Sequence, residues 1–283
     1  MNIKKIAVIG GGTMGNGITH VFAMSGFEVN LIEINKELLD KALNTISKNL
    51  DRQVKKEIIT EKDKEDILTR INSIESVENT PVDVDLIIEA IVENKEAKLD
   101  IFNKLQTQVK PEAIFASNTS SISITELSNS GRPDKFIGMH FMNPVPVMKL
   151  VEIIRGYSTS DETFNTIKEL SEKLGKVPVE VFDYPGFVAN RILMPMINEA
   201  IFALMEGVAS KEDIDTVMKL GMSHPMGPLT LADFIGLDVC LAILEVLYNG
   251  FNDPKYRPCP LLKKMVAAKK LGRKNGEGFF KYE

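Results

Sequence analysis

The strongest constraint on this chain is a glycine-rich turn that directly follows an apolar strand near its start. Ile6–Ile9 reads as a buried strand, and Gly10, Gly12 and Gly15 follow it in the spacing G-x-G-x-x-G. In this pattern the first glycine permits a tight turn, the second lets backbone approach a diphosphate, and the third lets helix and strand pack closely. The N-terminus of the following helix favours an anion. The turn alone would also fit a plain strand–helix connection. The segments that flank it decide between this interpretation and dinucleotide binding.

That context predicts dinucleotide binding. A helix is expected from Asn16 to Ser25, and a second strand, Glu28–Ile32, ends at Glu33. An acidic residue roughly 20 positions after the glycines accepts hydrogen bonds from the adenosine ribose of NAD. Thr13 and Met14 complete the predicted cofactor loop. We therefore predict NAD as the cofactor; Lys36, close to Glu33 in sequence, leaves NADP as the less favoured possibility.

Composition excludes several other classes of protein. The chain of 283 residues is 44% hydrophobic and 26% charged, with a net charge of −5, which argues against a nucleic-acid surface. No apolar run approaches the roughly 18 residues of a membrane span. The predicted fold begins by Ile3, which leaves no room for a signal peptide. Cys240 and Cys259 form no metal-binding or C-x-x-C spacing, so we predict reduced thiols in a cytoplasmic protein without a metal site.

The first part of the chain predicts an α/β fold of the Rossmann type, with a doubly wound, mostly parallel sheet. Further strands are expected at Ile71–Ile74, Leu86–Ala90, Ala113–Ala116, Phe136–His140, Leu150–Ile154 and Val177–Val181, with helices at Lys95–Gln108 and Ile124–Leu127. The charged segment from Lys36 to Arg70 is longer than a crossover helix, so it predicts a helical arm leaning away from the sheet. Asn143–Pro146 is too short for a crossover, so the strands on either side of it should be antiparallel.

From residue 186 onward the pattern changes to successive helices. We predict a dinucleotide-binding domain at 1–185 and an all-helical substrate and dimerisation domain at 186–283. The expected helices are Phe187–Met205 with a kink at Pro195, Lys211–Leu220 capped by Ser210, Leu229–Leu247 and Leu261–Lys270. The abundance of Leu, Ile and Met in this domain predicts a contact with a second subunit, in a homodimer or larger homo-oligomer.

The three histidines are the first candidates for a proton acceptor. His20 lies within the first helix and His224 in a loop, whereas His140 ends a strand and precedes the Asn143–Pro146 turn. Ligands of open α/β sheets bind at the carboxyl ends of strands, so His140 is placed to reach one. If the turn is centred near Pro146, Glu152 faces His140 on the next strand and can stabilise its protonated form. Spacing alone also allows the two side chains never to touch.

Two further polar segments are candidates for a substrate site. Ser117–Ser121 follows another strand end and could offer hydrogen bonds to a cleft, or could be an ordinary capped turn. Asn190 lies just inside the helix that opens the second domain, where its amide could bind a substrate oxygen or act at a cap or hinge.

Taken in order, these segments resemble the short-chain L-3-hydroxyacyl-CoA dehydrogenases, most closely their bacterial members of butyrate-type fermentation. The resemblance spans nearly the whole chain. It is carried by the segments at 8–15, 89–93, 116–121, 140–146, 150–152 and 183–191, and by the tail at 227–230 and 272–279.

The resemblance implies roles for individual residues. His140 would be the general base, Glu152 its partner, and Ser117 and Asn190 would hold the reacting oxygen of an acyl-CoA substrate. The cofactor contacts would include Glu33, Glu93 and Lys98, with Ala90 and Asn118 lining the nicotinamide side. Lysines of the helical arm would bind the CoA portion, with Lys48, Lys55 and Lys56 as candidates.

Two alternatives stay open at this point. A related dehydrogenase could act on a free hydroxy acid, of the hydroxyisobutyrate type, which uses a lysine where this chain has Asn190, or of the gulonate type, which shares the His and Asn motifs. An NAD-binding protein without turnover would be expected to have lost one of Ser117, His140, Glu152 or Asn190, and this chain retains all four.

Overall fold

The structure, a computed structural model, describes residues 3–282. It divides into two compact units, Met1–Asp183 and Tyr184–Glu283, which we describe separately. No helix of the described residues is long and apolar enough to cross a membrane.

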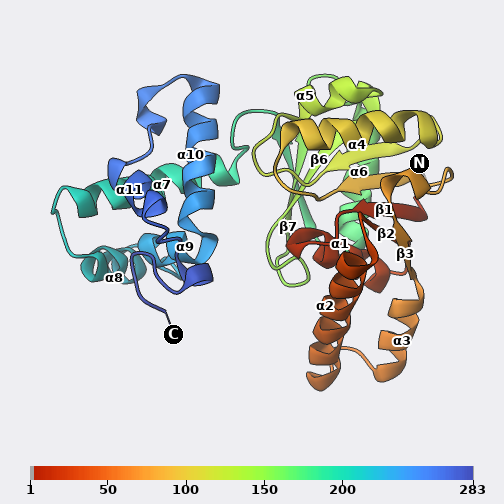
Figure 1. The fold of residues 1–283 in the computed structure, drawn as a ribbon, viewed down its shortest axis with the longest axis horizontal. Helices are drawn as coiled ribbons and strands as arrows, with labels where there is room; N and C mark the ends of the chain where they lie inside the picture. Colours follow the sequence, from red (N-terminus) through yellow and green to blue (C-terminus); the bar gives the residue numbers. More distant parts are fainter. Residues whose placement is uncertain (1–2, 283) are drawn as a thin grey trace. The chain divides into compact units, whose positions relative to one another are not determined.

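The first unit is built on one eight-stranded sheet (Figure 1). Its strands are β1 (Lys5–Ile9), β2 (Glu28–Glu33), β3 (Ile71–Glu75), β4 (Leu86–Glu89), β5 (Ile114–Ser117), β6 (Phe136–Phe141), β7 (Leu150–Arg155) and β8 (Val177–Phe182). They lie in the order β3-β2-β1-β4-β5-β6-β7-β8. The first six strands lie in the order typical of a dinucleotide-binding fold. In this order β2 and β3 lie on one side of β1, and β4, β5 and β6 lie on the other side. The predicted doubly wound sheet is confirmed.

The sheet is parallel except between β6 and β7. These two strands are joined by the turn at Asn143–Pro146 and pair antiparallel, with His140 opposite Glu152. The predicted register is therefore confirmed.

Six α-helices accompany the described part of this sheet: α1 (Thr13–Met24), α2 (Lys36–Lys55), α3 (Glu61–Thr69), α4 (Lys95–Gln108), α5 (Ile124–Leu127) and α6 (Asp161–Lys173). Apolar residues of α1, α2, α3 and α6 share one core with the strands, including Ile18, Phe22 and Ile167. On the other face, Phe102 of α4 packs against Phe115 and Phe136. The crossover helix α6 was absent from our sequence prediction, although Ser160 caps it through the Thr163 N–H.

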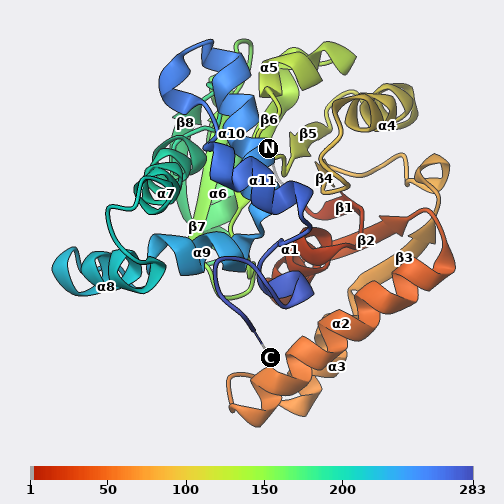
Figure 2. The same cartoon turned by 60° about the vertical axis from the view of Figure 1, so that its left-hand side comes forward.

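The predicted helical arm is present as α2 and α3, which run side by side away from the sheet (Figures 1 and 2). Each helix begins at a clear cap, because Asn35 accepts from the Leu38 N–H and Thr60 forms a capping box with Asp63. Only one stripe of α2 is buried, through Leu39, Ala42, Ile46 and Leu50, which leaves its other faces available to ligands.

The described part of the second unit contains five α-helices: α7 (Ala189–Met205), α8 (Lys211–Gly221), α9 (Pro228–Ile235), α10 (Leu237–Phe251) and α11 (Pro260–Ala267). Single-turn 3-10 helices across the two units are η1 (Val77–Asn79), η2 (Ser128–Ser130), η3 (Pro133–Lys135), η4 (Pro254–Tyr256) and η5 (Arg273–Asn275). The second unit has its own core, which includes Ile197, Leu229 and Leu244.

Two helix predictions in this unit were wrong. The single helix expected at Leu229–Leu247 is two helices, because Gly236 has a φ of +106°, a backbone conformation that interrupts the helix and that glycine adopts without strain. The helix expected to reach Lys270 ends at Ala267, before Lys269 with a φ of +56°. Pro195 lies within α7 without ending it.

Candidate active site

The glycine turn joins β1 to α1 at the point where the strand order reverses. Gly10 has a φ of +95°, and a Cβ added there would lie 2.9 Å from the carbonyl oxygen of Ala90. A Cβ on Gly15 would lie only 1.7 Å from the carbonyl oxygen of Gly10, so the turn and helix require glycine at both positions. Gly12 has no atom within 4 Å of such a Cβ, which leaves its face free for the approach of a ligand.

The same turn fits a dinucleotide electrostatically. Among the described residues no side chain caps α1 at Gly12, and no acidic residue occupies its first turn. Its N-terminal N–H groups and helix dipole therefore suit a diphosphate. Glu33 closes β2 and accepts a hydrogen bond of 2.7 Å from the Gly11 N–H through Oε1. Each oxygen of a carboxylate can accept a second bond, so Glu33 can still take one from a ribose hydroxyl.

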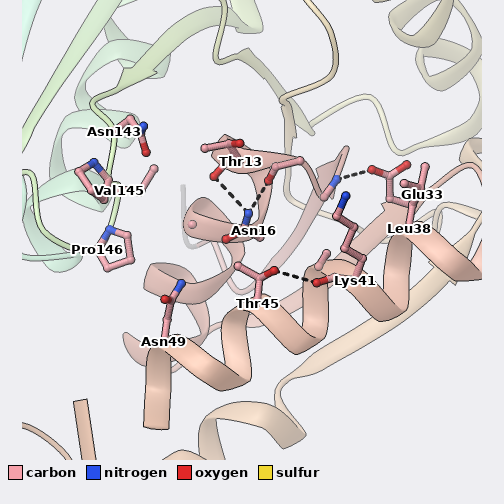
Figure 3. A pocket seen from close by; sticks show the side chains of 15 residues that line it. Thr13, Asn16, Glu33, Leu38, Lys41, Thr45, Asn49, Asn143, Val145 and Pro146 are labelled. Atoms are coloured by element: carbon pink, nitrogen blue, oxygen red, sulfur yellow. Dashed lines mark hydrogen bonds between the residues drawn. The ribbon is translucent and has the colours of Figure 1, made fainter. Parts of the chain in front are cut away.

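A cavity of about 390 Å³ opens beside this turn, between α1, α2 and the β6–β7 loop (Figure 3). Thr13 and Glu33 line it, together with a polar stripe of α2 formed by Lys41, Thr45 and Asn49. This stripe was not among the residues predicted from the sequence, although its i, i+4, i+8 spacing places the three side chains on one helix face.

The opposite wall of the cavity is the β6–β7 loop, which contributes Asn143, Val145 and Pro146 (Figure 3). Lys176 holds this loop, because its Nζ donates hydrogen bonds of 2.5 and 2.7 Å to the carbonyl oxygens of Val145 and Met148. Burial lowers the pKa of Lys176 below its usual range.

The candidate CoA-binding lysines Lys48, Lys55 and Lys56 are exposed on or directly after α2, and none lines this cavity. Lys41, Lys48 and Lys55 are spaced by seven residues, about two helical turns, so they form one basic stripe along the arm.

The imidazole of His140 contacts the carboxylate of Glu152 directly. The Nδ1 atom of His140 lies 2.7 Å from Oε2 of Glu152, and both side chains are buried. Antiparallel pairing of β6 with β7 places them opposite each other on one face of the sheet. The predicted contact is therefore present. Such a carboxylate orients the ring by holding Nδ1.

Ser117 is the last residue of β5 and Asn118 follows it, next to the carboxyl end of β6. Asn118 Oδ1 accepts a 3.0 Å hydrogen bond from the Phe141 N–H, which ties the ends of the two strands together. Ser117 is fully buried, and its hydroxyl donates a 2.6 Å hydrogen bond to Oε2 of Glu89.

Glu89 and Glu93 share the ammonium of Lys98. Lys98 Nζ lies 2.6 Å from Oε1 of Glu89 and 3.3 Å from Oε2 of Glu93. Glu93 also accepts hydrogen bonds from Thr119 and Ser121. Glu89 was not predicted as a site residue from the sequence. A carboxylate at the end of the apolar run Leu86–Ile88 is itself a signal, because charges are rarely buried without a partner.

The two carboxylates titrate in opposite directions. Burial raises the pKa of Glu89 above its usual range despite the nearby Lys98 ammonium. Burial acts on Glu93 in the same sense, but the Lys98 charge and the hydrogen bonds from Thr119 and the Ser120 N–H outweigh it and hold the pKa of Glu93 below its usual range. Opposed shifts of this kind are frequent at functional sites.

The remaining predicted residues are distributed as follows. Met14 packs on the core of the first unit, and Ala90 follows β4, where its N–H donates to the Ile9 carbonyl. Asn190 is the second residue of α7, in the second unit. Within the described residues, no three His, Cys, Asp or Glu side chains are grouped to hold a metal ion.

The strand order and the glycine turn define a dinucleotide-binding protein of the Rossmann type. Residues 5–184 match the model of the 3-hydroxyacyl-CoA dehydrogenase NAD-binding domain, and residues 186–282 match that of the 3-hydroxyacyl-CoA dehydrogenase C-terminal domain. The chain belongs to the 3-hydroxyacyl-CoA dehydrogenase family, and its first unit is the NAD-binding domain of an NAD-dependent dehydrogenase.

Individual relatives agree with this assignment. A probable 3-hydroxybutyryl-CoA dehydrogenase of Deinococcus radiodurans is 59% identical, over 98% of this chain and 100% of the relative. The 3-hydroxybutyryl-CoA dehydrogenase of Bradyrhizobium diazoefficiens is 55% identical, over 99% of this chain and 96% of the relative. The crystal structure of (S)-3-hydroxybutyryl-CoA dehydrogenase from Ralstonia eutropha superimposes with a TM-score of 0.96 at 50% identity, with 100% of both chains covered.

Proposed function

We propose that this protein is an (S)-3-hydroxybutyryl-CoA dehydrogenase, which interconverts 3-hydroxybutyryl-CoA and acetoacetyl-CoA. The observation that carries the proposal is the buried 2.7 Å contact between His140 and Glu152 at the carboxyl end of β6, in an NAD-binding unit of this family. We also propose a cytoplasmic location, because the free thiols of Cys240 and Cys259 are typical of a reducing compartment.

His140 is the general base of the oxidation. It takes the proton of the C3 hydroxyl through Nε2, and Glu152 stabilises the imidazolium that forms. In the reduction, the imidazolium returns the proton to the developing alkoxide. General acid–base catalysis of this kind contributes roughly 10²–10⁴-fold to the rate. A nicotinamide, when bound, would accept and donate the hydride at its C4.

Other residues bind and orient the reactants. Ser117 and Asn190 are proposed to hold the oxygen on C3. Gly10, Gly12, Thr13, Met14 and Gly15 are proposed to surround the diphosphate. Glu33, Glu93 and Lys98 are proposed as further cofactor contacts, with Ala90 and Asn118 on the nicotinamide side. The two ion pairs of the buried Lys98 support this assignment, because they fix the polar edge of the sheet before a ligand arrives.

The CoA portion of the substrate is proposed to bind along the helical arm. CoA carries several phosphate charges, and the basic stripe of Lys41, Lys48 and Lys55 offers ammonium groups along α2. Lys56 directly follows the helix, next to Lys55 in the chain, and is proposed as a further contact.

Glu33 is proposed to favour NAD over NADP. Its carboxylate is fixed by the Gly11 N–H, so a 2′-phosphate on the ribose would meet a negative charge. At an effective dielectric constant of about 20, like charges ~4 Å apart repel by ~4 kcal/mol before screening. Lys41 lines the same cavity as Glu33 and can offset part of this repulsion, whereas Lys36, the cation considered from the sequence, does not line it.

A homodimer, or a larger homo-oligomer, is proposed to form through the second unit. An apolar groove of about 440 Å³ lies on its surface, lined by residues of α7, α8 and α9 that include Ile214 and Val217. Val208, Leu220 and Met222 are exposed apolar side chains of the same unit. Exposed apolar surface of this kind is typical of a subunit interface.

The proposal is tested by initial rates with acetoacetyl-CoA, supplied in turn with NADH and NADPH. We expect NADH oxidation, a preference for NADH of roughly 5- to 150-fold from a net penalty of 1–3 kcal/mol, and little activity on free acetoacetate. In His140→Gln, kcat should fall by at least roughly 10² with little change in NADH affinity. A greater activity on free hydroxy acids would instead indicate the hydroxyisobutyrate or gulonate type of dehydrogenase.

A further inference from the structure

The β6–β7 loop, residues 143–149, is a mostly exposed wall of the cavity beside the glycine turn. Four of its residues line the cavity (Figure 3), but Val145 alone is buried and the others are partly or fully exposed. The N–H groups of Val147 and Met148 both donate to the carbonyl oxygen of Pro144. These bonds close the turn within the loop but do not tie it to the rest of the unit. The position of this wall therefore depends on contacts with other elements.

Lys176 supplies the first of these contacts. It directly precedes β8, which pairs with β7, so its side chain starts beside the base of the loop. Lys176 is only 9% exposed, and its Nζ donates to the carbonyl oxygens of Val145 at 2.5 Å and Met148 at 2.7 Å. In the part of the chain that the structure describes, no carboxylate forms an ion pair with this ammonium. The loop carbonyls are thus the partners that compensate the burial of its charge.

Gly17 of α1 supplies the second contact, from below the loop. A Cβ added at Gly17 would lie 2.9 Å from the Cβ of Val145 and 3.6 Å from the Cδ of Pro146. The first distance is shorter than two such carbon atoms can pack, so the loop rests directly on the backbone of α1. Gly17 therefore sets how closely the loop approaches α1, and Lys176 keeps the loop from moving away.

We propose that Lys176 is a positioning residue that, together with Gly17, holds the β6–β7 loop as the wall against which the dinucleotide binds. A protein whose binding-competent form is populated only in part loses affinity by that fraction. The inference rests on the assignment of this cavity to the cofactor, and not on the proposed substrate. His140 and Glu152 are held by the pairing of β6 with β7, so the loop should affect cofactor affinity more than turnover.

Lys176→Met tests this role, because it keeps an unbranched side chain and removes both hydrogen bonds to the loop. A loop that is in place for a tenth of the time raises Kd tenfold. We expect Kd for NADH, measured by fluorescence, to rise roughly tenfold on this basis, with kcat at saturating NADH changed less than about twofold. ADP-ribose carries the adenosine ribose and the diphosphate but no nicotinamide. Its Kd, measured by calorimetry, should rise by the same factor.

Gly17→Ala is an independent second variant that leaves Lys176 in place. Its methyl group would push the loop away from α1, so Kd for NADH and for ADP-ribose should again rise together. Two matched controls should leave both Kd values unchanged. Lys135→Met removes an ammonium that donates to the Pro111 carbonyl, away from the cavity. Gly221→Ala adds a methyl group in α8, where a Cβ has no atom within 4 Å.

The outcomes distinguish the possible failures. If folded Lys176→Met binds NADH and ADP-ribose as the unmodified protein does, the positioning role is wrong. A loss of affinity for NADH alone would place the effect at the nicotinamide and would also overturn it. If circular dichroism shows that Lys176→Met does not fold, the same two Kd values in Gly17→Ala decide. Failure of the unmodified protein to bind NADH would contradict the cofactor assignment, whereas NADH binding without acetoacetyl-CoA reduction would contradict only the proposed substrate.

Discussion

At the scale of single residues, the contact between His140 and Glu152 requires a charge as well as an orientation. Glu152→Gln keeps a hydrogen-bond acceptor beside Nδ1 but removes the negative charge that stabilises the imidazolium. In the oxidation of 3-hydroxybutyryl-CoA, we expect kcat to fall by roughly 10-fold to 10²-fold. The acidic limb of the pH–rate profile of this oxidation should move to lower pH. The measurement is kcat between pH 5 and pH 9, with circular dichroism to confirm folding.

A matched control for this variant is Glu180→Gln on β8. Glu180 is an exposed carboxylate that pairs with Arg155, outside the candidate site. It should leave the pH–rate profile as in the unmodified protein. Normal turnover and an unmoved profile in Glu152→Gln would show that the contact does not serve catalysis.

His20 makes a separate prediction about stability. Burial, helped by the positive charge of Lys176, lowers the pKa of His20 from 6.5 to about 4. The folded state then binds fewer protons than the unfolded state between these values, so stability is lost as pH falls through this range. Between pH 7 and pH 5 the loss is about 2 kcal/mol.

His20→Gln should remove this loss of stability between pH 7 and pH 5. The measurement is the free energy of unfolding by denaturant at the two pH values. His224→Gln, in a loop between α8 and α9, is the control and should keep the pH dependence of the unmodified protein. An equal loss of stability in His20→Gln and in the unmodified protein would contradict the prediction.

At the scale of elements, what could be predicted depended on how local the signal was. The β1 turn and the β6–β7 register follow from short patterns, because Gly10–Gly15 and Asn143–Pro146 each restrict the backbone directly. Helix α6 was missed although its cap at Ser160 and the buried spacing of Thr163, Ile167 and Leu170 both mark it. The break at Gly236 was missed because a single glycine can also be tolerated inside a helix.

The candidate site shows the same limit. The position of one turn is enough to predict that His140 faces Glu152. The contacts among Glu89, Lys98 and Ser117, in contrast, join β4, α4 and β5. Three elements meet there through the order of strands in the sheet, which no local spacing encodes. Lys41 was missed for a similar reason, because the opposite wall of its cavity comes from the distant β6–β7 loop.

The arm leads to a prediction about recognition of CoA. Lys48→Glu combined with Lys55→Glu reverses two charges of the exposed stripe on α2. We expect KM for acetoacetyl-CoA to rise about tenfold at low salt with kcat nearly unchanged, since exposed charges act modestly and are screened. The acetoacetyl thioester of N-acetylcysteamine lacks the phosphates, so its KM should not change. Lys62→Glu on α3 is the control, and an equal rise in KM for both thioesters would contradict a phosphate-binding role.

At the scale of the whole molecule, the two units make separable contributions. Val217 lies in the apolar groove of the second unit and is 60% exposed, so a charge there should oppose association without disturbing a core. We therefore expect the unmodified protein to sediment as a dimer or larger oligomer. The Val217→Asp variant should sediment with at most half the mass of that oligomer. NADH binding, measured by fluorescence, should be retained, because the glycine turn and Glu33 belong to the first unit.

Val82→Asp places the same charge on an equally exposed valine of the first unit and should leave the oligomer intact. This control distinguishes a specific surface from a general effect of added charge. If Val217→Asp also lost NADH binding, the variant would have disturbed folding beyond the groove, and Leu220→Asp, at a side chain that is 81% exposed, would replace it. A monomeric unmodified protein, or an oligomer that survives both substitutions, would exclude this face of the second unit as the subunit interface.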